Sequence, residues 1–213
     1  MRDAHKPGLI ETMRQRADGT IDRLPLHLNR LRHSAEILKI PHDPVETAAA
    51  IEGLKADGGD RRLRLELSPH GEIRMEVFPC PAMDMRRPWQ IAFAATHLRS
   101  TDPLLPHKTT FRNVYTRARD EFPSDRIDEV VLCNEKDELC EGTITSVFLQ
   151  VRESETLLTP ALSSGLLRGV LRQELLDTGK AREAVLTRSD LQAASRIYVG
   201  NSLRGLIPAV LVQ

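Results

Sequence analysis

Several residue types and patterns are scarce in this sequence, and each shortage narrows the range of functions. Aromatic residues make up only 4% of the 213 residues, so stacking platforms for bases or sugars are not expected. Lysine plus arginine and aspartate plus glutamate each total 30, which gives a formal net charge of zero. Proteins that follow a phosphate backbone normally carry a basic excess, so nucleic acid is not an expected partner.

Cysteines and apolar runs are also few. The three cysteines, Cys80, Cys133 and Cys140, form no C-x-x-C pair and are odd in number, which is typical of reduced thiols in the cytoplasm. The N-terminal stretch MRDAHKPGLIETMRQR has charges but no apolar signal region, and no apolar run approaches the roughly 18 residues of a membrane span. We therefore expect a cytoplasmic protein without a membrane segment.

The motifs of several enzyme classes are missing. The chain has no G-x-G-x-x-G after a predicted strand, no G-x-x-x-x-G-K-[ST] and no G-x-S-x-G, which excludes the common nucleotide-binding loops and the nucleophile elbow. The seven histidines form no H-E-x-x-H and no cluster with cysteines, so we expect no metal site and place most histidines at the surface. With 40% hydrophobic and 28% charged residues, the chain is typical of a globular protein with a sizeable core.

Periodicity predicts helices and strands in the first half of the chain. Apolar residues recur at helical spacing over 24–40, and a second helix is predicted at 44–56. Residues 63–67 and 73–77 alternate apolar with charged side chains, which predicts a hairpin whose charged face could pair arginine with glutamate. The next strand is predicted at 90–95.

A domain boundary is predicted near residues 98–104. The stretch 96–108 contains two prolines and no periodicity, which is typical of a connection between domains. The boundary separates a small N-terminal α+β domain, residues 1–98, from a larger C-terminal α+β domain, residues 104–213.

The second half of the chain also mixes helices with strands. Helices are predicted at 110–122, at 168–179 and after Thr187, where Asp190 completes a capping box. Strands are predicted at 129–134, 146–151, 196–200 and 206–212. The predicted fold class is therefore α+β, in two lobes.

Four segments hold residues that could perform chemistry. In chain order they are HLNRL at 27–31, HKTT at 107–110, EGTIT at 141–145, and the pair of turns GLLRG at 165–169 and GNSLRG at 200–205. Taken singly, each has an ordinary structural explanation, such as a solvated loop lysine or a surface arginine. Taken together and in this order, they resemble the class IV aminotransferase family, which uses pyridoxal phosphate on fold type IV.

This resemblance covers roughly Leu9 to Val212. Within the family, the combination of HKTT, EGTIT, GLLRG and GNSLRG is most similar to the aminodeoxychorismate lyases and to the lyase-like domain fused to some aminodeoxychorismate synthases. The resemblance implies the two-lobed fold of the D-amino acid aminotransferases. The family usually has a strand and an Asp-Arg-Gly segment before the position of Leu9, so we expect a shortened N-terminal lobe.

The resemblance implies a role for three charged residues. Lys108 matches the lysine that forms the Schiff base with the cofactor and moves protons. Glu141 stands where the family places the carboxylate that keeps the pyridine nitrogen protonated. Arg30 matches the arginine that donates hydrogen bonds to the cofactor phosphate.

Further phosphate donors and a substrate side are implied in the same way. The phosphate donors are Leu167, Arg168, Gly169 and Val170, which open a helix, and Asn201 and Ser202 in a second turn. Thr12 matches a position on the substrate side of the lyases and joins Lys108 and Glu141 as an expected catalytic residue. Arg64 is a candidate for gripping a substrate carboxylate, with a cross-strand ion pair on the exposed face as the alternative.

Two further positions depart from the family pattern. Ser146 stands where the family often has asparagine. Asn113 stands five residues after Lys108, where branched-chain enzymes place a tyrosine that touches the phenolic oxygen of the cofactor, and the nearest tyrosine is Tyr115. This difference argues against a branched-chain enzyme.

The implied function is a pyridoxal-phosphate lyase that converts 4-amino-4-deoxychorismate to 4-aminobenzoate and pyruvate in folate biosynthesis. Two alternatives stay open. The first is a class IV transaminase acting on branched-chain or D-amino acids, and the second is a cofactor-binding relative with little turnover. The family also implies a small-molecule substrate and a homodimer, because its active site lies near the dimer interface.

Overall fold

The computed structural model describes residues 6–80, 87–123, 125–152 and 154–212. The chain forms two compact units, Met1–Ala82 with His107–Phe111, and Met83–Pro106 with Arg112–Gln213. Strand β4, Trp89–Phe93, belongs to the second unit because it pairs in parallel with two strands of that unit's sheet. This grouping differs from the predicted boundary, which placed residues up to 98 in the N-terminal domain.

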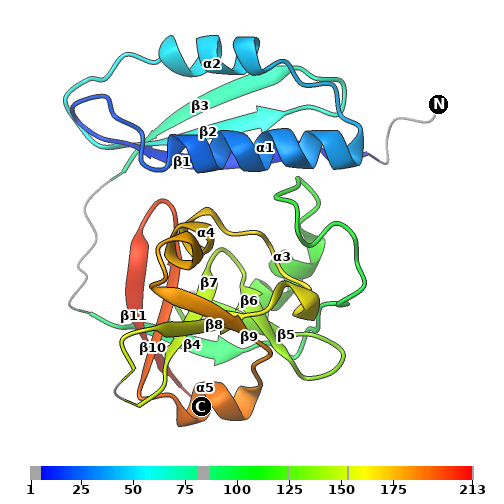
Figure 1. The fold of residues 1–213 in the computed structure, drawn as a ribbon, viewed down its shortest axis with the longest axis vertical. Coiled ribbons are helices and arrows are strands. Elements are labelled where there is room, and N and C mark those ends of the chain that lie inside the picture. The colour runs from blue at the N-terminus through cyan, green and yellow to red at the C-terminus, as the bar shows by residue number, and fades with distance from the viewer. Residues whose placement is uncertain (1–5, 81–86, 124, 153, 213) are drawn as a thin grey trace. The chain divides into compact units, whose positions relative to one another are not determined.

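The first unit is a three-stranded antiparallel sheet with two helices (Figure 1). The sheet order is β1 (Leu9–Gln15), β2 (Arg61–Leu67) and β3 (Ile73–Pro79), and the helices are α1 (Leu24–Leu38) and α2 (Pro44–Glu52). Helix α2 begins where the Asp43 side chain accepts hydrogen bonds from the amides of Val45 and Glu46. It ends at Gly53, which explains why it is shorter than the predicted helix.

Apolar residues at alternate positions of β2 form part of the core of the first unit. Leu63, Leu65 and Leu67 are fully buried and pack with Leu31 and Ala35 of α1. Burial of each leucine contributes about 1.5–3 kcal/mol. The predicted hairpin of β2 and β3 is confirmed.

The predicted elements did not include β1. Its alternate residues Leu9, Glu11, Met13 and Gln15 are all buried, but two of the four are polar, so the period of two is hidden in a hydropathy pattern. Residues with polar side chains on the core face of a strand need partners inside the protein. The partners of Glu11 form part of the candidate site.

The second unit contains an eight-stranded mixed sheet in the order β6-β5-β4-β11-β10-β7-β8-β9. The strands not yet given are β5 (Glu129–Cys133), β6 (Leu139–Gly142), β7 (Ser146–Gln150), β8 (Leu157–Pro160), β9 (Ala181–Ala184), β10 (Arg196–Asn201) and β11 (Gly205–Leu211). The helices are α3 (Asn113–Asp120), η1 (Leu162–Ser164), α4 (Val170–Asp177) and α5 (Arg188–Ala193). All three α-helices and four of these strands match predicted elements, and the capping box of α5 is confirmed. Strands β6, β8 and β9 were not predicted.

Side chains from both faces of this sheet contribute to its cores. All five residues of β5 are buried, with Val131 and Cys133 in one apolar cluster and Val130 and Leu132 in another. Among the described residues, no helix is both long and apolar enough to cross a lipid bilayer.

Candidate active site

The segment that carries Lys108 is held against the start of β1 in the first unit. The amide of Ile10 donates to the carbonyl oxygen of Lys108 at 2.8 Å, and the amide of Thr110 donates to the carbonyl oxygen of Gly8 at 2.9 Å. Gly8 allows the end of the neighbouring strand β2 to lie close, since a Cβ there would lie 2.8 Å from the carbonyl oxygen of Leu67. The backbone at Lys108 is therefore fixed by main-chain pairing.

His107 anchors the same segment to α1. Its Nδ1 lies 2.9 Å from Oγ of Ser34, and both residues are buried. His27 is 1% exposed, so these two histidines are exceptions to the predicted surface positions, whereas His33, His70 and His97 are exposed.

Arg30 belongs to a buried cluster with Glu11 and His27. Its Nε donates to Oε1 of Glu11 at 2.8 Å, and its Nη2 donates to Oε2 at 2.6 Å. Nδ1 of His27 lies 2.6 Å from the same Oε2. The sequence analysis assigned a role to Arg30 but none to Glu11 or to His27, the first residue of HLNRL. A glutamate and a histidine in amphipathic segments resemble surface residues.

The pKa values of Glu11 and His27 are both lowered, but for different reasons. Burial alone would raise the pKa of Glu11, but the charge of Arg30 and the hydrogen bonds from His27 and Arg30 outweigh burial and lower that pKa to about 2. Burial also lowers the pKa of His27, more than the charge of Glu11 raises it. Glu11 is thus a carboxylate at neutral pH, and the neutral His27 ring donates its Nδ1 proton to it.

Thr12 and Arg64 lie on the other face of the same sheet, directly opposite each other in register. Arg64 donates to Glu76 across the hairpin at 2.9 Å and contacts Glu66 at 2.6 Å. The cross-strand pair that was the alternative for Arg64 is therefore present. A role for either residue toward substrate stays a prediction.

Glu141 lies on β6 in the second unit and is 4% exposed. The hydroxyl of Tyr115, on α3, donates to its Oε1 at 2.7 Å, and the amide of Leu167 donates to the same oxygen at 3.2 Å. Burial, followed by the charge of Glu141, raises the pKa of Tyr115, so the phenol remains a hydrogen-bond donor. Leu167 was predicted as a phosphate donor; its amide contacts Glu141 in this structure, and its role toward phosphate stays a prediction.

A second buried carboxylate, Glu129, shapes the turn that follows Glu141. Glu129 is fully buried and accepts hydrogen bonds from the amides of Thr143 and Ile144 and from the hydroxyls of Thr143 and Thr145. Gly142 is required here, because a Cβ would lie 2.7 Å from this carboxylate. In the sequence, the one sign that Glu129 is buried is its position directly before the apolar residues of β5.

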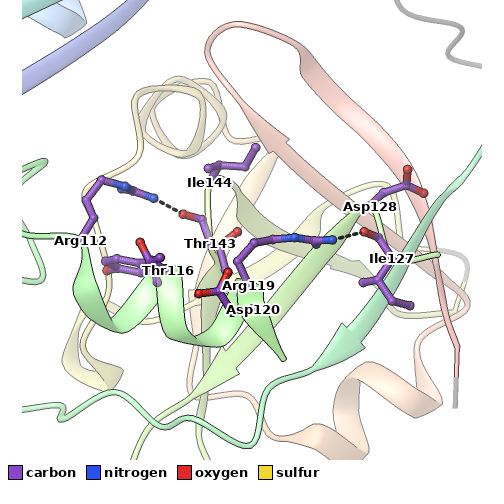
Figure 2. Close-up of a pocket in the computed structure, with 9 residues that line it drawn as sticks. Arg112, Thr116, Arg119, Asp120, Ile127, Asp128, Thr143 and Ile144 are labelled. Atoms are coloured by element: carbon purple, nitrogen blue, oxygen red, sulfur yellow. Dashed lines mark hydrogen bonds between the residues drawn. The ribbon is translucent and has the colours of Figure 1, made fainter. Parts of the chain in front are cut away.

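Arg112 closes the same turn from the side of α3. Its Nη2 donates to the carbonyl oxygen of Thr143 at 2.6 Å, and its guanidinium lies over the ring of Tyr115, 4.9 Å from the ring centre. Figure 2 shows Arg112 beside a pocket of about 420 Å³, where Arg119 also reaches a main-chain oxygen, that of Ile127. Among the described residues, those predicted to bind cofactor do not line this pocket.

The start of α4 supplies backbone amides. The amide of Gln173 is the first to donate into the helix, to Gly169 at 2.8 Å, so the amides of residues 170–172 precede the helical ladder. Gly169 is the N-cap, and a Cβ there would lie 2.5 Å from Oγ of Ser146. The amide of Arg168 donates to Pro106 at 3.4 Å and that of Gly169 to Leu167 at 2.8 Å.

Asn201 builds the turn between β10 and β11. Its side-chain oxygen accepts from the amides of Leu203 and Arg204, and its Nδ2 donates to the carbonyl oxygen of Ile144 at 3.1 Å. Both ends of the side chain therefore hold protein turns, and the contact of Asn201 with phosphate stays a prediction. Ser202 is buried, and its contact with phosphate stays a prediction.

The residues present fit the chemical needs of pyridoxal phosphate. The first unit carries the amine of Lys108 and the oriented guanidinium of Arg30. The second unit carries the buried carboxylate of Glu141 and the start of α4, where glycine keeps side-chain atoms away from the amides. An amine, a carboxylate for a pyridinium and donors for a phosphate are the groups this cofactor requires.

Comparison with known proteins defines the class. The family model for amino-transferase class IV matches residues 8–212. The chain belongs to this family of pyridoxal-phosphate-dependent enzymes, and its α+β architecture is fold type IV, as predicted from the resemblance.

Three individual proteins are similar over most of their length. A solved structure described as a "Putative amino-acid aminotransferase" from Mesorhizobium loti is 43% identical, with a TM-score of 0.90, and the match covers 97% of this chain and all of that one. A Schizosaccharomyces pombe protein named "Putative aminodeoxychorismate lyase" is 27% identical, over 92% of this chain and 86% of its own. A Thermotoga maritima protein named "Probable branched-chain-amino-acid aminotransferase" is 28% identical, over 94% and 75% respectively.

Proposed function

We propose that the protein binds pyridoxal phosphate and acts as an aminodeoxychorismate lyase, converting 4-amino-4-deoxychorismate to 4-aminobenzoate and pyruvate in folate biosynthesis. The observation that carries this proposal is the Glu141 carboxylate, which is buried and has one oxygen held by Tyr115 and Leu167. A carboxylate fixed away from water favours a positive charge on a nitrogen placed beside it. That is the requirement of a protonated pyridine ring.

Each residue then has a defined task. When bound, pyridoxal phosphate accepts the electron pair left on the substrate carbon after a proton is removed. Glu141 keeps the proton on the pyridine nitrogen. Nζ of Lys108 takes the proton from the substrate carbon and returns one to the product. Arg30, the start of α4 and Ser202 hold the phosphate, while Thr12 lines the substrate side.

The preference for the lyase rests on features outside this shared machinery. The turns GLLRG and GNSLRG are most similar to those of the lyases, and the Schizosaccharomyces pombe relative carries a lyase name over most of its length. Asn113 also stands where branched-chain enzymes place a tyrosine. The similarity to the Thermotoga maritima protein supports a second candidate, a transaminase for branched-chain or D-amino acids.

A single set of assays decides between these candidates. With aminodeoxychorismate as the sole substrate, we expect 4-aminobenzoate and pyruvate in equal amounts, without added 2-oxoglutarate. Amino transfer from leucine or D-alanine to 2-oxoglutarate, without formation of aminobenzoate, would establish the transaminase. Cofactor binding without either reaction would identify a relative with little turnover.

We also propose a homodimer that acts on its small-molecule substrate in the cytoplasm. The support is the family's placement of its active site near a dimer interface. The mass in solution, measured by light scattering, is expected to be twice the 23.9 kDa of one chain.

A further inference from the structure

Glu11 occupies a position where an apolar residue would ordinarily stand. It is 2% exposed and alternates along β1 with Leu9 and Met13, both part of the apolar core. On the neighbouring strand it lies opposite the buried Leu65. A charge in such surroundings is costly unless it is paired, so its pairing with Arg30 calls for an explanation beyond folding.

The pairing fixes the plane of the Arg30 guanidinium. The side of the group formed by Nε and Nη2 faces both carboxylate oxygens, at 2.8 and 2.6 Å. A two-point contact of this kind removes rotation about the last bonds of the side chain. The remaining N–H bonds, including those of Nη1, are then directed away from Glu11.

His27 adds a further restraint at one of the two carboxylate oxygens. It lies one helical turn before Arg30 on α1, and its Nδ1 contacts Oε2 of Glu11 at 2.6 Å. Since burial keeps its ring neutral, His27 adds a hydrogen bond without adding charge. Glu11 is therefore held by two residues of α1 while its backbone is fixed in β1.

We propose that Glu11 is a positioning residue that aims the Arg30 guanidinium at the phosphate of the cofactor. This inference rests on the proposed binding of pyridoxal phosphate through Arg30. Glu11 does not touch the ligand. Its loss weakens recognition of the phosphate group and leaves recognition of the pyridine ring unchanged.

The test compares two ligands that differ only in the phosphate, pyridoxamine 5'-phosphate and pyridoxamine. Neither forms a covalent bond with Lys108. Dissociation constants are measured by calorimetric titration for the wild type, Glu11→Gln and Arg30→Ala. We expect Glu11→Gln to weaken binding of the phosphorylated ligand roughly tenfold or more, with binding of pyridoxamine changed less than about twofold.

A matched control is available in the same unit. Asp60 accepts a hydrogen bond from Nε of Arg14 at 2.9 Å and also contacts Nη2 of that arginine. Asp60→Asn therefore breaks another arginine–carboxylate pair, to which no role in phosphate binding is assigned. In Asp60→Asn, the ratio of the dissociation constants for pyridoxamine and pyridoxamine 5'-phosphate is expected to stay at the wild-type value.

The outcomes separate this inference from the proposed function. If Arg30→Ala leaves the ratio unchanged, phosphate binding through Arg30 is wrong, and the role of Glu11 is overturned with it. If Arg30→Ala lowers the preference for phosphate and Glu11→Gln does not, only the role of Glu11 is overturned. If Glu11→Gln lacks a cooperative thermal transition, Glu11→Asp takes its place. It keeps the charge on a shorter side chain, and an unchanged ratio there overturns the proposal equally.

Discussion

At the scale of single residues, a substitution of Glu141 can separate the effect of its charge on turnover from the binding of the cofactor. Glu141→Gln keeps the size of the side chain and removes its charge, so the pyridine nitrogen loses the partner that keeps it protonated. We expect kcat to fall roughly a hundredfold, while the affinity for pyridoxamine 5'-phosphate changes much less. Steady-state kinetics and ligand titration measure the two effects. Turnover at the wild-type rate would assign the role to another residue.

The lowered pKa of Glu11 has a consequence for stability. Its pKa falls from 4.5 to about 2 on folding, so the ionised form stabilises the folded state above pH 4.5, and this contribution disappears as the pH falls toward 2. The difference corresponds to about 3 kcal/mol. The free energy of unfolding of the wild type minus that of Glu11→Gln should therefore shrink between pH 4.5 and pH 2. A difference that stays constant over this range would contradict the assignment.

Local motifs in the sequence indicated the charged candidate residues but not the residues that support them. Lys108, Glu141 and Arg30 are recognised because their local motifs resemble a family. Glu11, His27 and Glu129 are buried polar residues, and a sequence pattern does not distinguish a buried glutamate with partners from a solvated one. The contact between Tyr115 and Glu141 joins α3 to β6 across 26 positions of the chain, which no local pattern encodes.

At the scale of secondary-structure elements, the turn between β6 and β7 should be sensitive to one added methyl group. Gly142→Ala would place Cβ against the carboxylate of Glu129 and the hydroxyl of Thr145. We expect a loss of about 1–3 kcal/mol in the free energy of unfolding, measured by urea denaturation. Gly59→Ala is the control, because its Cβ would meet only Asp57, at 3.8 Å, and its effect should stay within about 0.5 kcal/mol. Equal effects of the two changes would refute this account.

Long, periodic elements could be predicted and short or polar ones could not. Helix α1 and the hairpin of β2 and β3 have a clear period, and both were predicted. Strands β6, β8 and β9 have four residues each, too few to show a period. Strand β1 is longer, but Glu11 and Gln15 interrupt the apolar side that would have identified it.

At the scale of the whole molecule, the candidate residues for cofactor chemistry are divided between the two units. The amine is assigned to Lys108 in the first unit. Borohydride reduction of the protein loaded with pyridoxal phosphate, followed by peptide mapping, is expected to place the pyridoxyl group on Lys108. Lys108→Ala should retain phosphate-dependent binding of pyridoxamine 5'-phosphate and give no labelled peptide. A label on Lys39 or Lys136 in the wild type would contradict the assignment.

The turn around Glu129 also dictates which substitutions related sequences can accept. Glu129 receives the hydroxyls of Thr143 and Thr145, and its carboxylate excludes any side chain at 142. Ile144 is 46% exposed and contributes only its backbone to this arrangement. Across homologues, position 144 should therefore drift freely while positions 142, 143 and 145 stay constant wherever 129 is acidic. Lineages that have lost the acid at 129 should have lost the glycine and both threonines as a group, so the four positions should be inherited as one unit.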